Sequence, residues 1–259
     1  MKIKLTTQDL TAIAVCSALY AIFGYLTSGI TFFGIGFLPA VVIPAVFAVL
    51  YGPWVGGMSG AIGIFIRDMF VHGNPALSLA AGVPPNFILF FLIGYLSTKN
   101  ISLKQALTCV SLAIICLLVP SIIFLPDMAA FQNFSDTAFL LIFMLTIISS
   151  LVAITVFSIR WKEWRSYAIG AIVGQIIGCL LLSATLWYVS PLFLETLQLQ
   201  TPLAAIAILP LFVWTIATEI PFILIAGPPI LKVIQKAFPT LQYKNKRLGK
   251  GETIDQKNC

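Results

Sequence analysis

Charged side chains are scarce in this sequence, where Asp, Glu, Lys and Arg make up only 9% of the 259 residues. Soluble domains carry about 25% of such residues, so this composition excludes an ordinary soluble fold. Hydrophobic residues make up 59% of the chain, in runs close to the roughly 20 residues that cross a bilayer as a helix. Because backbone groups in lipid must bond within the protein, we expect an all-α, polytopic integral membrane bundle.

Motifs for catalysis and energy supply are also missing. The sequence has no GxxxxGK[ST] phosphate-binding loop, no HExxH zinc motif and no GxSxG nucleophile motif. The single histidine, His72, has no second ligand at metal-binding spacing, and none of the five cysteines forms a CxxC motif. We therefore expect a chain that is not an enzyme, with no catalytic residues, no metal and no cofactor.

Eight apolar segments are separated by turns or charged connectors, and a half-helix over 75–81 precedes the fourth. The second and third segments are short, and we expect prolines to kink or end the fifth and to break the eighth. Residues 1–236 should form one transmembrane domain without a cleavable signal, followed by a basic, disordered cytoplasmic tail over 237–259. The predicted spans are residues 9–28, 38–51, 53–70, 84–96, 104–125, 137–159, 166–189 and 202–233.

The basic residues predict the topology. With eight spans, every Lys and Arg except Arg67 falls on one side of the membrane, together with both termini. The positive-inside rule places that side in the cytoplasm of a multi-pass cell-membrane protein. The net charge of +6 therefore reports topology rather than nucleic-acid binding.

Small residues recur at helical spacing in three places. Glycines over 52–63 and at Gly170, Gly174 and Gly178 predict helices that pack backbone to backbone. Ala14 and Ala18 give the first span a similar small face. That face either packs within the chain or docks on another subunit.

Polar residues inside lipid are costly and are often functional. Arg67 and Asp68 are consecutive, so they point about 100° apart on a helix and should each meet a different partner. They either anchor the outer loops or form the lip of a substrate cavity. Asn86, which follows two prolines, is either a helix cap or a binding residue.

Glu219 and Gln175 lie at similar depths on two successive spans. They form either a structural hydrogen bond or a shared polar site, and Pro221 frees the carbonyl of Ala217 beside them. Trp214 is either a lipid-facing aromatic or a stacking wall. Together with Trp187, Tyr188, Glu219 and Gln175, it would suit a flat heterocycle that is partly cationic or rich in donors. The candidate substrate-binding residues are Arg67, Asp68, Asn86, Gln175, Trp214 and Glu219.

The chain resembles the substrate-binding S-components of energy-coupling factor (ECF) transporters. The resemblance rests on the Ala14-xxx-Ala18 face, the segment FLPAVVIPAVFAVLYGP, and the glycine run from Gly56 to Gly63 that leads to Arg67-Asp68. It covers residues 9–98, with a looser likeness over 165–236. It implies a six-helix core, to which residues 104–160 add extra helices.

The resemblance also implies a function. The chain would capture a small vitamin-like nutrient from outside, and Ala14 and Ala18 would meet a transmembrane coupling subunit that works with two ATPase subunits. Two alternatives stay open from the residues alone. One is a self-sufficient carrier with Glu219 as its proton site, and the other is an intramembrane enzyme or assembly factor.

Overall fold

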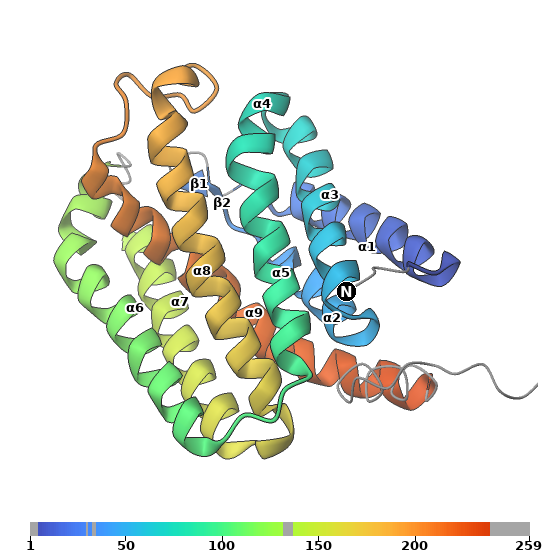
Figure 1. Cartoon of the computed structure of the whole chain (residues 1–259). Helices are drawn as coiled ribbons and strands as arrows, with labels where there is room; N and C mark the ends of the chain where they lie inside the picture. The colour runs from blue at the N-terminus through green and yellow to red at the C-terminus, as the bar shows by residue number, and fades with distance from the viewer. Residues whose placement is uncertain (1–4, 30, 33–34, 132–136, 239–259) are drawn as a thin grey trace, which may run out of the picture.

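The chain folds as a bundle of helices, seen in a computed structural model that describes residues 5–29, 31–32, 35–131 and 137–238 (Figure 1). Its α-helices are α1 (Thr7–Leu26), α2 (Val42–Tyr51), α3 (Pro53–Val71), α4 (Pro75–Leu77), α5 (Val83–Ser97), α6 (Leu103–Phe131), α7 (Thr137–Thr155), α8 (Arg165–Val189) and α9 (Ile208–Ala237). The predicted class of a polytopic helical membrane bundle is confirmed.

Shorter elements connect or extend these helices. The strands β1 (Thr31–Phe32) and β2 (Ile35–Gly36) form a small antiparallel ribbon between α1 and α2. The 3-10 and π-helical segments are η1 (Pro39–Val41), η2 (Ser78–Gly82), η3 (Val156–Arg160), η4 (Lys162–Trp164), η5 (Ser190–Leu192) and η6 (Ala205–Ala207). Segment η2 joins α4 to α5, so the predicted half-helix over 75–81 continues directly into the next span.

Seven helices in the described part of the chain are long and apolar enough to cross a membrane. The remaining predicted span corresponds to the shorter apolar helix Pro39–Tyr51. A tight turn at Gly52 connects this short helix to α3, and the φ of 100° at Gly52 is a conformation that favours glycine. This short helix therefore packs within the bundle beside longer neighbours, including α3, α5 and α9.

The prolines do not end the fifth span or break the eighth, so those two expectations are wrong. Helix α6 runs past Pro120 and Pro126 to Phe131, and α9 contains Pro221 and Pro228–Pro229 without interruption. Neighbouring side chains in a membrane bundle can satisfy the backbone groups that proline frees. At Pro221 this is visible, because Ser150 Oγ of α7 donates a hydrogen bond of 2.9 Å to the carbonyl of Ala217.

The two glycine ladders pack as predicted. On α3, a Cβ at Gly56 would clash with Ala48 of α2, and one at Gly60 would clash with Phe90 of α5. On α8, a Cβ at Gly174 would lie 2.8 Å from the backbone oxygen of Leu89 of α5. Glycine thus lets α3 and α8 approach α5 from its two sides.

Helices α6 and α7 lie side by side at one edge of the bundle, against α8 and α9 (Figure 1). Helix α9 crosses obliquely behind α8 and α5, and it reaches Ala237, just inside the predicted tail. The rest of that tail, residues 239–259, lies outside the described residues, as do residues 132–136 between α6 and α7. Helix α6 ends at Phe131, beyond the predicted limit of the fifth span at residue 125.

Candidate functional site

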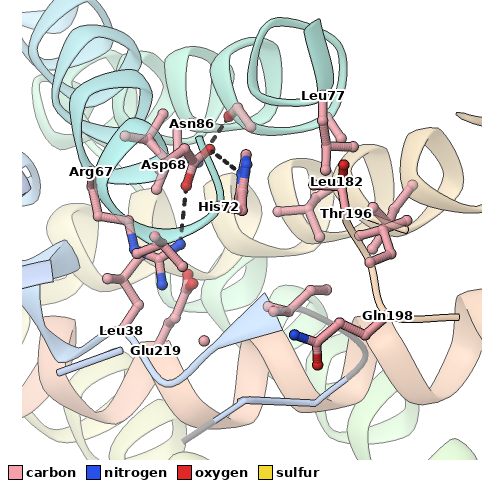
Figure 2. A pocket seen from close by; sticks show the side chains of 18 residues that line it. Leu38, Arg67, Asp68, His72, Leu77, Asn86, Leu182, Thr196, Gln198 and Glu219 are labelled. Atoms are coloured by element: carbon pink, nitrogen blue, oxygen red, sulfur yellow. Dashed lines mark hydrogen bonds and ion pairs between the residues drawn. The ribbon is translucent and has the colours of Figure 1, made fainter. Parts of the chain in front are cut away.

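A cavity of about 220 Å³ lies between α3, α5, α8 and α9. The β2 strand and the turn after α8 complete its wall, and Leu182 and Leu186 of α8 contribute an apolar surface. Figure 2 shows that the polar side chains reach it from different elements. These polar residues are Arg67, Asp68, His72, Asn86, Thr196, Gln198 and Glu219.

Arg67 and Asp68 lie on the cavity wall near the end of α3, and both are more than nine-tenths buried. Arg67 Nη1 binds Asp68 Oδ1 at 3.0 Å (Figure 2), so the expectation that each meets a separate partner is wrong. Neighbouring Cβ atoms diverge on a helix, but the long arginine side chain bends back far enough to reach the carboxylate. The other oxygen, Asp68 Oδ2, accepts a hydrogen bond of 2.7 Å from Ser78 Oγ.

Two glycines leave room for this ion pair. A Cβ at Gly36 of β2 would lie 2.5 Å from Arg67 Nη2, and a Cβ at Gly82 would lie 2.7 Å from Asp68 Oδ2. Both glycines also line the cavity. The pair therefore fits only because side chains are missing from the facing backbone.

His72 and Asn74 tie the C-terminal end of α3 to the turn after α8. His72 Nδ1 accepts from the backbone N–H of Asn74 at 3.1 Å, and its Nε2 lies 3.8 Å from Asp68 Oδ2. Asn74 Oδ1 accepts from the N–H of Leu77, while its Nδ2 donates to Thr196 Oγ1, both at 3.1 Å. The connector before α4 is thereby fastened to the turn that carries Thr196 and Gln198.

Gln198 has a left-handed backbone conformation with a φ of 54°. Residues other than glycine adopt this region at an energetic cost, and such strain is concentrated at functional sites. Here the strained residue lines the cavity.

Glu219 and Gln175 are brought together, as their similar depth predicts. Gln175 Nε2 donates to Glu219 Oε2 at 3.0 Å, and Cys179 Sγ donates to Gln175 Oε1 at 3.0 Å. Glu219 lines the cavity, whereas Gln175 is fully buried behind it. Gln175 therefore orients the carboxylate without lining the cavity itself.

Asn86 lines the cavity but does not cap a helix. Helix α5 already begins at Val83, so Asn86 lies inside its first turn. Its Oδ1 accepts from the Tyr20 hydroxyl at 2.9 Å, and its Nδ2 donates to the carbonyl of Gly82 at 3.0 Å. The amide thereby joins α1 to α5 at the cavity wall.

Trp214 is fully buried and is not among the residues that line the cavity. Its Nε1 donates to the carbonyl of Ile35 at 3.1 Å, and its ring stacks on Phe143 of α7. It thus holds the β ribbon in place, and the expectation that it faces lipid or forms a stacking wall is wrong. Trp187 and Tyr188 also lie outside the lining, and Tyr188 is 76% exposed.

Several lining residues could not be recognised in the sequence. Thr196 and Gln198 reach the cavity from a turn, and Gly36 and Gly82 contribute by lacking a side chain. No residue pattern marked them, because each acts through segments that are distant in the sequence. No group of three or more metal-ligating side chains occurs in the residues that the structure describes.

Ala14 and Ala18 are exposed on the outer face of α1. The buried face of this helix, which includes Cys16, Ser17 and Tyr20, packs against α2 and α3. The small residues are therefore not used for packing by the described part of the chain.

Comparison with known proteins finds a family match in the N-terminal part of the chain. Residues 8–126 match the family model described as ECF transporter, substrate-specific component. The resemblance seen in the sequence is thus confirmed, and it extends into α6, beyond the limit at residue 98 that the sequence predicted.

Curated relatives match over a shorter stretch. Two UPF0397 proteins of Aliivibrio fischeri are each 41% identical over 100 residues, which are 38% of this chain and 53% of the relative. A UPF0397 protein of Aliivibrio salmonicida is 41% identical over 68 residues, which are 26% of this chain and 37% of the relative. The chain thus spans about half the length of the first relatives. No solved structure matches it.

Proposed function

Because residues 8–126 match the ECF transporter substrate-specific component, we propose that this chain is the substrate-binding subunit of an ECF-type importer. It takes a small, vitamin-like nutrient from outside the cell into the cavity between α3, α5, α8 and α9. Partner subunits then supply the energy for uptake, since this sequence contains no phosphate-binding loop.

The observation that carries this proposal is the convergence of Arg67, Asp68 and Glu219 on one small cavity inside an apolar bundle. Ionisable groups at membrane depth are expensive, and they usually mark a binding site or a transport pathway. A substrate that pairs with these groups would offset part of that cost. The cavity is also close in size to the lower end of the range for small-ligand pockets, roughly 300 Å³.

The proposed orientation places the cavity on the outer side. The connectors over 98–102 and 160–164 lie at one end of the bundle, while α4 and the orange connector after α8 lie at the other (Figure 1). The first end carries Lys99, Arg160 and Lys162. The positive-inside rule assigns that end to the cytoplasm, with both termini, so the cavity side faces outward.

The proposed contact with the coupling subunit is the exposed face of Ala14 and Ala18 on α1. Small residues allow close approach of another transmembrane helix. One coupling subunit and two ATPases would complete the transporter.

A thermal-shift screen of the detergent-purified chain tests the binding role. The panel contains vitamins, nucleobase derivatives, amino acids, quinones and metal ions. A ligand at about 100 times its Kd stabilises the folded state by about 2.7 kcal/mol, so one compound should raise Tm clearly. A wild-type protein that no compound stabilises would contradict the proposal.

Glu219→Gln then locates the site. This variant can keep a hydrogen bond with Gln175 but loses the charge, so affinity should fall by more than about tenfold. The control is Glu163→Gln, which removes an exposed carboxylate outside the cavity. Equal affinity of both variants would place the ligand elsewhere.

A further inference from the structure

One edge of the Arg67 guanidinium has no hydrogen-bond partner among the described residues. Nη1 is occupied by Asp68, whereas Nε and Nη2 are buried and make no hydrogen bond to any residue that the structure describes. These two nitrogens form one side of the planar guanidinium, where their N–H bonds are parallel. That geometry matches the two oxygens of a carboxylate or a phosphate.

Such a pair of unsatisfied buried donors is unusual. Buried polar groups in folded proteins nearly always have a hydrogen-bond partner. A buried donor without one has lost its hydrogen bonds to water and gained nothing in return, which costs free energy. Arg67 is 6% exposed and lines the cavity. An acceptor that enters the cavity would therefore be strongly favoured at this edge.

Glu219 faces the same cavity from α9 (Figure 2). Gln175 occupies only Oε2, and no described residue donates to Oε1. Arg67 and Glu219 do not form an ion pair with each other in the described structure. Among the described residues, an unpaired cationic edge thus lies just behind one wall of the cavity, and an unpaired carboxylate oxygen belongs to another wall.

Building on the binding role proposed above, we infer that the ligand is a small zwitterion. Its anionic group lies on the Nε–Nη2 edge of Arg67, and its ammonium or other cationic donor group lies on Glu219. Negative and positive charges would then alternate along one line: Asp68, Arg67, the anionic group of the ligand, its cationic group and Glu219. Ligands with a single charge fit less well, since a cation leaves the Arg67 edge unmet and an anion is repelled by Glu219.

The rest of the cavity agrees with a compact, non-aromatic ligand. No Phe, Tyr or Trp is among the described residues that line it, and the surface between the charged groups is aliphatic, with Leu38, Ile64 and Leu77. A flat heterocycle would have no ring to stack on. Gly36 shields the Arg67 edge, so the anionic group reaches it only after a small shift of β2 or of the guanidinium.

The test uses zwitterions with matched single-charge analogues. Wild-type protein is screened by thermal shift with β-alanine, γ-aminobutyrate, methionine and glycine betaine. Each is compared with the amine and the acid of the same carbon skeleton, beside the nutrient panel described above. A zwitterion should raise Tm, while its amine and its acid at the same concentration should not.

Variants of Arg67 and Glu219 test whether these two residues cause the preference for zwitterions. Arg67→Lys keeps a cation for Asp68 but removes the two-pronged edge, so zwitterion affinity should fall by more than about tenfold. Glu219→Gln should cause a similar loss. The controls Arg160→Gln and Glu163→Gln remove exposed charges outside the cavity and should bind as the wild type does.

The outcomes separate this inference from the proposed function. Tight binding of an uncharged or singly charged nutrient, unchanged in Arg67→Lys, would keep the binding role and overturn the zwitterion. Zwitterion binding that survives in both cavity variants would also overturn it. A wild-type protein that no compound stabilises would overturn the binding role and the zwitterion together.

Discussion

Arg67 shows how one side chain serves both the fold and the cavity. Its Nη1 pairs with the buried Asp68, and its Nε–Nη2 edge, beside Gly36, has no hydrogen-bond partner in the described part of the chain. Breaking a buried ion pair by removing one partner costs about 3–5 kcal/mol. The neighbours of Arg67 are therefore better places than Arg67 itself to change binding without unfolding the protein.

Gly36→Val should weaken binding without removing either member of the Arg67–Asp68 ion pair. A Cβ at this position would lie 2.5 Å from Arg67 Nη2, so valine should displace the guanidinium together with the Nε–Nη2 edge that the proposed ligand would use. We expect a loss of affinity of at least about tenfold, equal to about 1.4 kcal/mol, measured by calorimetry with the ligand found in the screen.

The matched control is Gly29→Val in the same connector, where a Cβ would meet no other atom within 4 Å. It should bind as the wild type does. Equal losses in both variants would mean that the connector, rather than the space beside Arg67, controls affinity.

At the scale of elements, α9 depends on a neighbour to remain continuous. Pro221 supplies no N–H for the carbonyl of Ala217, and Ser150 of α7 supplies a hydroxyl instead. This hydrogen bond joins α7 to α9 at Ala217, only two residues before Glu219. This hydrogen bond stabilises the helix that presents the carboxylate.

Ser150→Ala should destabilise the bundle by about 1–3 kcal/mol, because the buried Ala217 carbonyl loses its donor. In a Pro221→Ala background the backbone N–H of residue 221 takes over, so the same substitution should cost less. The difference, about 1 kcal/mol, is measured by SDS unfolding of the four proteins as a double-mutant cycle. An equal cost in both backgrounds would show that Ser150 acts in another way.

Helix α1 presents a different element-scale feature, because the small face of Ala14 and Ala18 is not covered by any described residue. Replacing Ala14 and Ala18 by leucine together should leave substrate binding unchanged, because both residues are exposed and lie outside the cavity lining. If α1 carries the proposed contact with a coupling subunit, uptake by cells that express both proteins should be lost, because leucine would keep the partner helix at a distance.

Binding and uptake are measured separately for this double variant. The exposed Val15→Leu on the same helix is the control for added bulk. Loss of ligand binding in the double variant would show that this face supports the fold instead of a partner.

At the scale of the whole molecule, charge and cavity lie toward opposite ends of the bundle. The basic connectors gather at one end, and the turn with Thr196 and Gln198 belongs to the other (Figure 1). Such an arrangement fits a protein that collects its ligand on one side of the membrane and meets the cell interior on the other.

Cysteine labelling tests this orientation. In a background without the native cysteines, Glu195→Cys should react with a membrane-impermeant maleimide on intact cells. Glu163→Cys should react only after permeabilisation. Both positions are exposed, so access depends on the side of the membrane alone. The reverse pattern would contradict the proposed topology.

The amino-acid sequence alone was enough to predict the helical class, most span limits and the meeting of Gln175 with Glu219. These properties follow from hydrophobicity and from depth along a helix, and both can be counted along a single chain. The glycine ladders were readable for the same reason, because lipid-embedded helices use small residues where backbones approach.

The direction in which each side chain points depends instead on the tertiary structure. Helix rotation and side-chain reach bring Arg67 back onto Asp68, turn Trp214 away from the cavity, and admit Thr196 and Gln198 from a distant turn. The continuity of α9 through Pro221 likewise depends on Ser150, which lies on another helix. These features arise from packing between helices, and packing depends on the shapes of all the neighbours at once.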